Sequence, residues 1–217
     1  MTHTAVLFDL DGTLLDTLED LGDSMNAVLR TLGFSPHPMD SYRYFVGDGV
    51  ENLARRALPE KARADEAVVR DCVTRMRAEY GRRWKDKTRL YDGMPELLDG
   101  LAARGVKSAI LSNKPHAAVL EVVDHFFRKW HFDAALGARP GVPIKPDAGA
   151  ALEVARALAV APGSFLYVGD TNTDMATAVA AGMFPVGALW GFRTAEELRA
   201  SGAAALVSRP EEILGLL

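Results

Sequence analysis

Two aspartates, Asp9 and Asp11, follow a short apolar run in the segment AVLFDLDGTLLDT. An ionised carboxylate can attack an electrophile or bind a metal, and a protonated one can act as a general acid. Two more aspartates, Asp170 and Asp174, stand four positions apart after another apolar run, in FLYVGDTNTD. A single acid after a strand is often only a helix N-cap. Several such runs that end in polar residues at one edge of a sheet instead indicate a site for chemistry.

The other polar residues of this kind are Ser112 in AILSNK and Lys145 in PIKPD. Clustered carboxylates repel one another unless a cation neutralises them, and hard oxygen ligands suit Mg²⁺. We therefore expect Asp9, Asp170 and Asp174 to form a Mg²⁺ site. Ser112 can donate a hydroxyl to a phosphoryl oxygen and Lys145 can supply a positive charge, so we expect this site to hold a phosphate as well.

The elements that must position these residues alternate along the chain. Short apolar runs predict strands at Ala5–Phe8, Val106–Leu111, Ala134–Leu136, Phe165–Val168, Val186–Leu189 and Ala204–Val207. Helical patterns lie between them at Glu96–Arg104, Pro115–Phe127, Ala148–Ala159 and Asp174–Ala181, and Thr194 with Glu197 predicts a capping box. Such alternation predicts an α/β fold with a parallel sheet covered on both faces. Ligands bind outside the carboxyl ends of such strands, where the acids lie.

A segment from about residue 17 to residue 87 breaks this alternation. Apolar residues recur at helical spacing up to Gly33, and Asn52–Leu58 and Asp65–Trp84 also predict helices, with no convincing strand. We infer an all-helical insert. The predicted domains are an α/β core of residues 1–15 and 89–217 and a helical domain of residues 16–88. The two crossings, near Leu15–Asp16 and Thr88–Tyr91, are expected to form a two-strand hinge.

The composition bounds the class of protein. The chain has 217 residues, 48% hydrophobic and 25% charged, with a formal net charge of −4. This acidic balance disfavours nucleic acid as a partner, and no apolar stretch approaches the ~20 residues of a membrane span. No signal-peptide pattern is visible, so we expect a cytoplasmic protein, monomeric or homodimeric. The single cysteine, Cys72, excludes an internal disulfide and is interpreted as a packing residue.

The segments DLDGTLLDT, LSNKP, IKPD and GDTNTDMATAVAAG, in this order and spacing, resemble the haloacid dehalogenase superfamily over nearly the whole chain. The resemblance implies a Rossmann-like core with an inserted helical cap domain. It also implies that Asp9 is the nucleophile that forms an aspartyl-phosphate and that Asp11 is the general acid and base. The implied phosphate-binding residues are Ser112, Asn113 and Lys145. The implied Mg²⁺ ligands are Asp9, Asp170, Asp174 and the backbone carbonyl of Asp11.

Narrower resemblances concern the substrate. Dehalogenating members lack the second acid of the first motif, so Asp11 favours phosphate chemistry. SNKP is similar to the Thr-Asn-Lys-Pro of phosphoglycolate phosphatases and related pyrophosphatases, and RYFVGDGVENLARRAL resembles their cap segment. There an arginine stands four residues before Gly-Asn-Gly; here Arg43 precedes Gly47 and Gly49, and Asp48 replaces the asparagine. The resemblance implies a phosphatase for a small phosphorylated metabolite, 2-phosphoglycolate first, with these four residues setting specificity.

Several alternatives stay open from the sequence. The chain could be a phosphatase or pyrophosphatase of other specificity, or a phosphomutase similar to β-phosphoglucomutase. A phosphoacceptor signalling module also uses an acidic cluster, Mg²⁺, a hydroxyl and a lysine, but it needs neither the helical insert nor a proton donor at Asp11. A catalytically idle binding protein is disfavoured because no motif residue is missing. Gly47–Gly49 could be only a turn between helices, and Lys114 is a further candidate for placing phosphate or substrate.

Overall fold

The computed structural model describes residues 3–217 of the chain, which divide into two compact units. The core unit contains the described residues up to Leu15 together with Leu90–Leu217, and the helical unit is Asp16–Arg89. Arg89, assigned to the core from the sequence, falls in the helical unit. There its guanidinium pairs with the Asp16 carboxylate at 2.8 Å.

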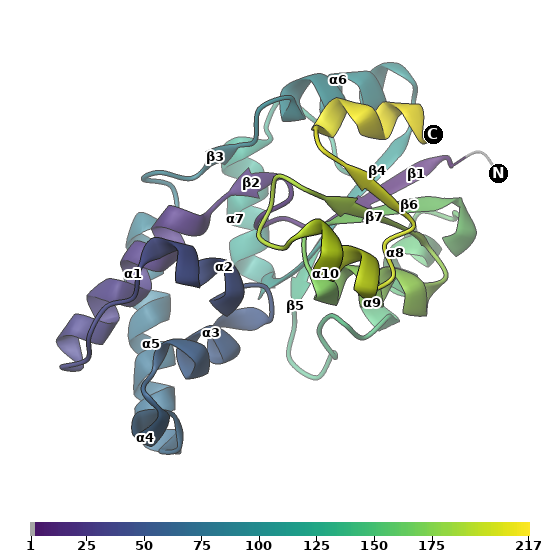
Figure 1. Ribbon diagram of the computed structural model, residues 1–217. Helices are drawn as coiled ribbons and strands as arrows, with labels where there is room; N and C mark the ends of the chain where they lie inside the picture. The colour runs from purple at the N-terminus through teal and green to yellow at the C-terminus, as the bar shows by residue number, and fades with distance from the viewer. Residues whose placement is uncertain (1–2) are drawn as a thin grey trace. The chain divides into compact units, whose positions relative to one another are not determined.

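The core unit is built on a six-stranded sheet with the order β5-β4-β1-β6-β7-β8, in which neighbouring strands run parallel (Figure 1). The strands are β1 (Ala5–Phe8), β4 (Lys107–Pro115), β5 (Ala134–Ala138), β6 (Phe165–Gly169), β7 (Phe184–Ala188) and β8 (Ala205–Val207). The predicted α/β class with a parallel sheet is therefore confirmed.

The strand β1 lies in the middle of the sheet, between β4 and β6. Phe8 is in register with Ile110 on one side and Val168 on the other. All four residues of β1 are buried, as a strand covered on both faces requires. The strands that lead into the three acidic or polar motifs are thus direct neighbours, and the motifs meet at one edge.

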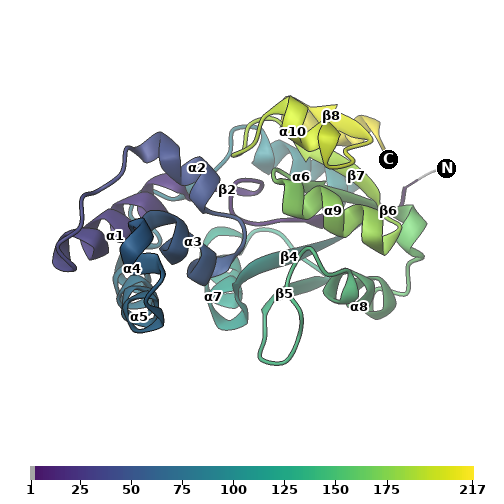
Figure 2. The ribbon, with the colours of Figure 1, turned by 60° about the horizontal axis from the view of Figure 1, so that its bottom comes forward.

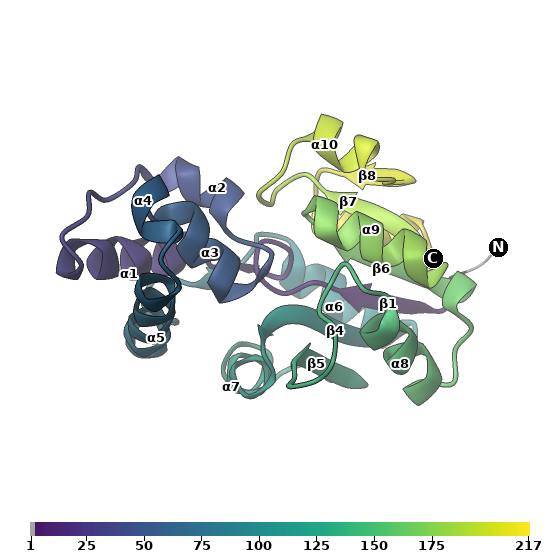
Figure 3. The same cartoon turned by 90° about the horizontal axis from the view of Figure 1, so that it is seen from below.

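Helices cover both faces of this sheet. They are α6 (Met94–Ala103), α7 (His116–Phe126), α8 (Gly149–Ala157), α9 (Asn172–Ala181) and α10 (Ala195–Ala200), with 3-10 turns η2 (Pro162–Ser164) and η3 (Pro210–Gly215). The helix α6 and the turn η3 lie on one face, and α8 and α9 lie on the other (Figures 1 and 3). On the second face Leu7 and Tyr167 of the sheet pack with Val154 and Ala178 in one apolar cluster. The short strand β8 is the edge strand of the sheet and lies beside β7 (Figure 2).

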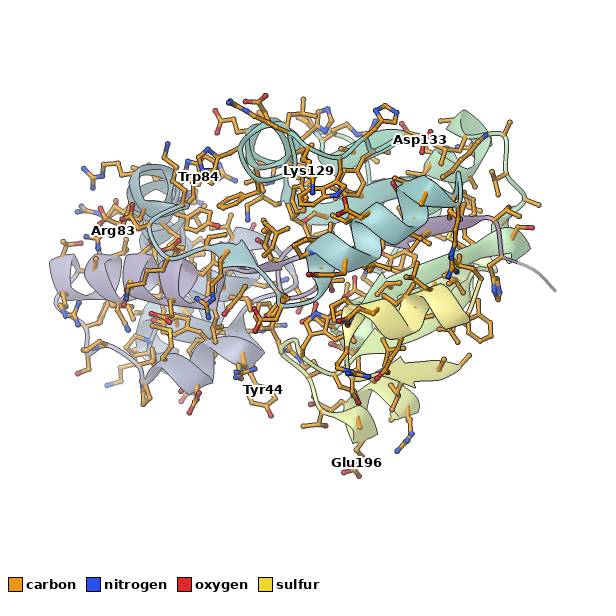
Figure 4. The ribbon with its side chains drawn as sticks, turned by 90° about the horizontal axis from the view of Figure 1, so that it is seen from above. Tyr44, Arg83, Trp84, Lys129, Asp133 and Glu196 are labelled. Carbon is orange, nitrogen blue, oxygen red and sulfur yellow. The ribbon has the colours of Figure 1, made fainter. Side chains whose placement is uncertain are left out.

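The helical unit contains α1 (Leu18–Thr31), α2 (Tyr42–Phe45), α3 (Gly49–Ala57), α4 (Glu60–Arg63), α5 (Glu66–Arg83) and the 3-10 turn η1 (Met39–Ser41). The long helices α1 and α5 pack against each other, and Arg83 and Trp84 lie at the end of α5 (Figure 4). Cys72 is buried with its Sγ 3.8 Å from the sulfur of Met25. Burial raises the pKa of the Cys72 thiol to about 11, as expected for a packing residue rather than a nucleophile.

Two short strands, β2 (Leu15–Asp16) and β3 (Arg89–Leu90), pair where the chain leaves the core and returns to it. The buried carboxylate of Asp20 on α1 accepts hydrogen bonds from the Thr88 backbone N–H and hydroxyl, both at 2.8 Å, and from the Lys87 N–H. The two crossings are therefore tied by hydrogen bonds rather than being loose linkers. No helix within residues 3–217 has the length and apolar character to cross a membrane.

Candidate active site

Three aspartates meet at the carboxyl ends of β1 and β6. Asp9 directly follows β1, Asp170 directly follows β6, and Asp174 lies in the first turn of α9. One carboxylate oxygen from each lies within 4.8 Å of the other two. Asp170 and Asp174 are fully buried and Asp9 is 5% exposed, so this acidic cluster is formed by side chains that water barely reaches.

A capping box at the start of α9 orients Asp174. The Thr171 hydroxyl and backbone N–H donate to Oδ2 of Asp174 at 2.6 and 3.0 Å. The other oxygen, Oδ1, accepts from Nζ of Lys145 at 2.7 Å. This cap satisfies the helix N-terminus and leaves Oδ1 directed toward Lys145, so Asp174 serves both the helix and the cluster.

Asp170 is held by the turn after β1 and by a distant loop. The Thr13 hydroxyl donates to its Oδ1 at 2.9 Å, and the Phe192 backbone N–H donates to Oδ2 at 2.8 Å. Gly12 has φ of 90°, and a Cβ there would lie 2.4 Å from Oδ2 of Asp170. Glycine is needed at position 12 because of both the left-handed backbone and this close approach.

Lys145 is the cation of the cluster. Its Nζ lies 2.8 Å from Oδ1 of Asp9 and 2.7 Å from Oδ1 of Asp174, and the residue is 4% exposed. The side chain of Asn113 holds the Lys145 backbone: its Oδ1 accepts from the N–H at 2.9 Å and its Nδ2 donates to the carbonyl at 3.1 Å. Asn113, expected to bind phosphate, thus also fixes the segment that presents Lys145.

Burial and repulsion between carboxylates dominate the electrostatics of the cluster. Burial, followed by repulsion from Asp174, raises the pKa of Asp9 well above its ordinary value despite Lys145. The same two causes raise the pKa of Asp170 to about 7. Burial would lower the pKa of Lys145, but Asp174 and Asp9 outweigh it and raise this pKa. When all are ionised, the three carboxylates and the one ammonium leave two negative charges, which one divalent cation neutralises.

The end of β4 brings the remaining core residues to the same edge. The sequence predicts a strand ending at Leu111, but β4 continues to Pro115 with a register irregularity between these residues. The buried Ser112 lies in this stretch, where its Oγ accepts from the Lys114 N–H at 3.2 Å. Nζ of Lys114 lies 2.6 and 2.7 Å from the two carboxylate oxygens of Asp11. The Asp11 carboxylate is therefore paired with Lys114, whereas Asp9 and Asp174 are paired with Lys145.

The four predicted specificity residues lie in the helical unit. Arg43 is on α2 with its side chain 43% exposed and Nε 3.9 Å from Asp40. Its neighbour Tyr44 is also exposed, with its side chain projecting from the ribbon (Figure 4). Gly47 and Gly49 have φ of 112° and 85°, so this turn requires glycine at both positions.

Asp48, between these glycines, occupies the N-cap position of α3 but makes no capping hydrogen bond with its side chain. Its carboxylate pairs with Arg56, which also donates to the Phe45 carbonyl at 3.1 Å. Asp48 stands where the similar cap segment has an asparagine, and Arg56 on α3 compensates the negative charge that this difference introduces.

Sequence reasoning missed several contacts that complete the site. The sequence does not reveal that Thr13 and the backbone of Phe192 hold Asp170, or that Gly12 lies against it. The partners of Asp170 are 157 and 22 residues away in the chain, so no local pattern could reveal them.

The family model of haloacid dehalogenase-like hydrolases matches residues 6–188, and the chain belongs to this family. It is similar to the phosphoglycolate phosphatase of Psychrobacter arcticus, at 32% identity over 92% of this chain and 89% of that protein. It is 29% identical to the phosphoglycolate phosphatase of Aquifex aeolicus, over 98% of this chain and 95% of that one. A crystal structure from Lactobacillus delbrueckii subsp. bulgaricus, of a provisionally assigned phosphoglycolate phosphatase, superimposes with a TM-score of 0.91 at 28% identity, covering 99% and 98% of the two chains.

Proposed function

We propose that the chain is a Mg²⁺-dependent phosphatase that hydrolyses a small phosphate monoester, 2-phosphoglycolate first, through an aspartyl-phosphate on Asp9. The general class, a phosphoric monoester hydrolase, is supported by the hydrolase family to which the chain belongs and by its phosphoglycolate phosphatase relatives. The metal, the particular ester and the roles of individual residues are proposals that the following observations support.

The observation that carries the proposal is the buried cluster of Asp9, Asp170 and Asp174 around Lys145. The three carboxylates offer only oxygen ligands and outnumber the single ammonium of Lys145, and burial with mutual repulsion raises the pKa values of Asp9 and Asp170. Mg²⁺ prefers such oxygen ligands. Bound by these three carboxylates and the Asp11 carbonyl, it would screen the charge of Asp9 from a phosphate dianion.

In the first step an oxygen of Asp9 attacks the phosphorus atom. The bond between phosphorus and the substrate alcohol breaks, and the alcohol oxygen takes a proton from Asp11 acting as general acid. The Ser112 hydroxyl and the Lys145 ammonium bind phosphoryl oxygens during this transfer. The products are the free alcohol and a phosphoryl group bonded to Asp9.

In the second step water attacks the same phosphorus atom. Asp11, now ionised, takes a proton from the water, the bond from phosphorus to Asp9 breaks, and inorganic phosphate leaves. Asp9 and Asp11 thus have different tasks although they are two residues apart. Their carboxylates pair with different lysines, Asp9 with Lys145 and Asp11 with Lys114, and this difference in surroundings supports the division.

Two observations support 2-phosphoglycolate as the substrate: the names of the relatives and the presence of Arg43 in the helical unit. We propose that Arg43 supplies a cation for the substrate carboxylate, since an arginine pairs with a carboxylate through two parallel hydrogen bonds. The negative charge of Asp48 would oppose an anionic substrate if it stood alone. Its ion pair with Arg56 removes that objection.

A panel of substrates with the full chain tests this function. Phosphate release is measured for 2-phosphoglycolate, pyrophosphate, β-glucose 1-phosphate and p-nitrophenyl phosphate, each with Mg²⁺ and with excess chelator. We expect the largest kcat/KM for 2-phosphoglycolate, no release in chelator and recovery when Mg²⁺ is restored.

Other outcomes would contradict particular parts of the proposal. Full activity in chelator would refute metal dependence. A preference for pyrophosphate or a sugar phosphate would overturn the substrate, and conversion of β-glucose 1-phosphate without release of phosphate would indicate a phosphomutase.

A further inference from the structure

The function proposed above assigns no task to Lys114, which forms an ion pair with Asp11. Nζ of Lys114 lies within hydrogen-bond distance of both carboxylate oxygens, at 2.6 and 2.7 Å. The Lys114 side chain is 6% exposed and that of Asp11 is 20% exposed. Hydrogen bonds between charged partners are stronger than neutral ones and fix their geometry most firmly when water is largely excluded.

The backbone around each partner is also held. Leu14 and Leu15 N–H groups both donate to the Leu10 carbonyl, and Gly12 donates to the Leu15 carbonyl, so the turn that carries Asp11 is closed. Lys114 lies on the last part of β4, the strand beside β1. Its backbone N–H donates to Oγ of Ser112 at 3.2 Å. One residue thus contacts both the candidate acid and the candidate phosphate-binding hydroxyl.

We propose that Lys114 is a positioning residue that fixes the carboxyl group of Asp11 for proton transfer to the leaving alcohol. The inference rests on the proposed function, in which Asp11 is the general acid and base. When Asp11 carries a proton its carbonyl oxygen still accepts from Nζ, and when it is ionised both oxygens accept. The same lysine can therefore orient Asp11 in both steps.

A charged lysine at this edge could instead contact the substrate carboxylate, or it could matter only for folding. The three roles differ in their dependence on the leaving group. An alkoxide needs a proton to depart, whereas p-nitrophenolate is a weak base that departs without one. Because kcat/KM reports only the steps up to transfer of the phosphoryl group to Asp9, it isolates this difference.

The experiment measures kcat/KM of the wild type and Lys114→Met with 2-phosphoglycolate, propyl phosphate and p-nitrophenyl phosphate. Propyl phosphate is an alkyl ester without a carboxylate. Misplacement of a catalytic group by ~1 Å can cost on the order of 10²-fold. We expect about that loss for both alkyl esters and a loss of less than about 5-fold for p-nitrophenyl phosphate.

Three further variants sharpen the result. Lys107→Met removes a lysine from the other end of β4, where it bonds the Leu158 carbonyl, and should leave all three substrates unchanged. Lys114→Arg keeps a cation and should recover part of the alkyl ester activity. In an Asp11→Asn background, Lys114→Met should cause no further loss, because Lys114 acts through Asp11.

Each contrary result has a definite meaning. Equal losses on the three substrates, with lower thermal stability, would reduce Lys114 to a structural residue. A loss confined to 2-phosphoglycolate would make it a substrate contact, and an additive loss in the Asp11→Asn background would also overturn the inference. A wild type that hydrolyses none of these esters would refute the proposed function instead, so the two failures are distinguishable.

Discussion

The core unit and the helical unit hold their candidate functional side chains in opposite ways. In the core, Asp9, Asp170 and Asp174 are buried, and each carboxylate is held by a lysine, a hydroxyl or a backbone N–H. In the helical unit Arg43 is 43% exposed and Asp48 is held by a partly exposed arginine. Reacting groups must be fixed before the substrate arrives, whereas a residue that recognises a leaving group can be ordered on binding.

The energetics of the two regions differ accordingly. Removing Lys145 would leave the buried carboxylates of Asp9 and Asp174 without their cation, and breaking a buried charge pair in this way costs about 3–5 kcal/mol. Exposed ion pairs are worth roughly 0–1 kcal/mol. Substitutions in the buried cluster of Asp9, Asp170 and Asp174 are expected to lower turnover of every substrate. Substitutions at Arg43 are expected to change the choice among substrates. The predictions below test this contrast, from the largest expected effect to the smallest.

Asp9→Asn is expected to lower kcat for every substrate by on the order of 10⁴-fold or more, since loss of a nucleophile is among the largest single effects on a covalent mechanism. Steady-state phosphate release measures it, and circular dichroism checks the fold. Asp124→Asn, which alters an exposed carboxylate paired with Arg128, is the matched control and should be fully active. Turnover near the wild-type rate in Asp9→Asn would refute the covalent mechanism in which Asp9 is the nucleophile.

Asp11→Asn should lower kcat/KM for 2-phosphoglycolate by about 10²–10⁴-fold, the usual contribution of one acid–base group. The loss with p-nitrophenyl phosphate should be smaller in kcat/KM, because its leaving group needs no proton. Initial rates with both substrates measure the difference. If the two losses are equal, Asp11 does not act as the general acid.

Arg43→Ala should lower kcat/KM for 2-phosphoglycolate by the equivalent of about 2–5 kcal/mol, the cost of removing one partner from a buried charge pair in a complex. The value for p-nitrophenyl phosphate, which has no carboxylate, should be almost unchanged. Arg83→Ala, at the end of α5 where its Nε pairs with Glu79 at 2.6 Å, is the control. A uniform loss on both substrates would make Arg43 a structural residue and weaken the contrast between the units.

Asp48→Asn is expected to change stability by less than about 1 kcal/mol, because its ion pair with Arg56 is partly exposed. The substitution also gives the Gly-Asn-Gly pattern of the phosphoglycolate phosphatase cap segment that this region resembles. We expect kcat/KM for 2-phosphoglycolate to stay within about 3-fold of the wild type, about 0.7 kcal/mol. Urea denaturation and initial rates measure the two effects; a large rise in activity would mean that the Asp48 charge opposes the substrate despite Arg56.

The strands and long helices of the fold follow from local sequence patterns, but their exact extent does not. Phe165–Val168 is a plain apolar run and was predicted almost to the residue. By contrast, β4 continues through polar residues to Pro115, which hydropathy cannot assign to a strand. The helices α2 and α4 have four residues each, too few for a 3.6-residue period to show.

The candidate site divides in the same way. Asp9, Asp170, Asp174 and Lys145 could be predicted because each stands in a short contiguous motif, and the parallel sheet brings those motifs to one edge. The contacts that orient them could not. Asp11 and Lys114 are 103 residues apart, and only the folded sheet brings the two together.

The central claim is that the core acts through a phosphoryl group bonded to Asp9. The most direct test mixes Asp11→Asn with Mg²⁺ and p-nitrophenyl phosphate, quenches with acid, and locates the phosphoryl group by peptide mass spectrometry. This variant loses the base that activates water but keeps a substrate that needs no acid, so a phosphorylated protein should accumulate. We predict a phosphoryl group on the peptide that carries Asp9 and none when Asp9→Asn is added. Phosphate release without a phosphorylated protein, or a phosphoryl group on Ser112, would contradict the account.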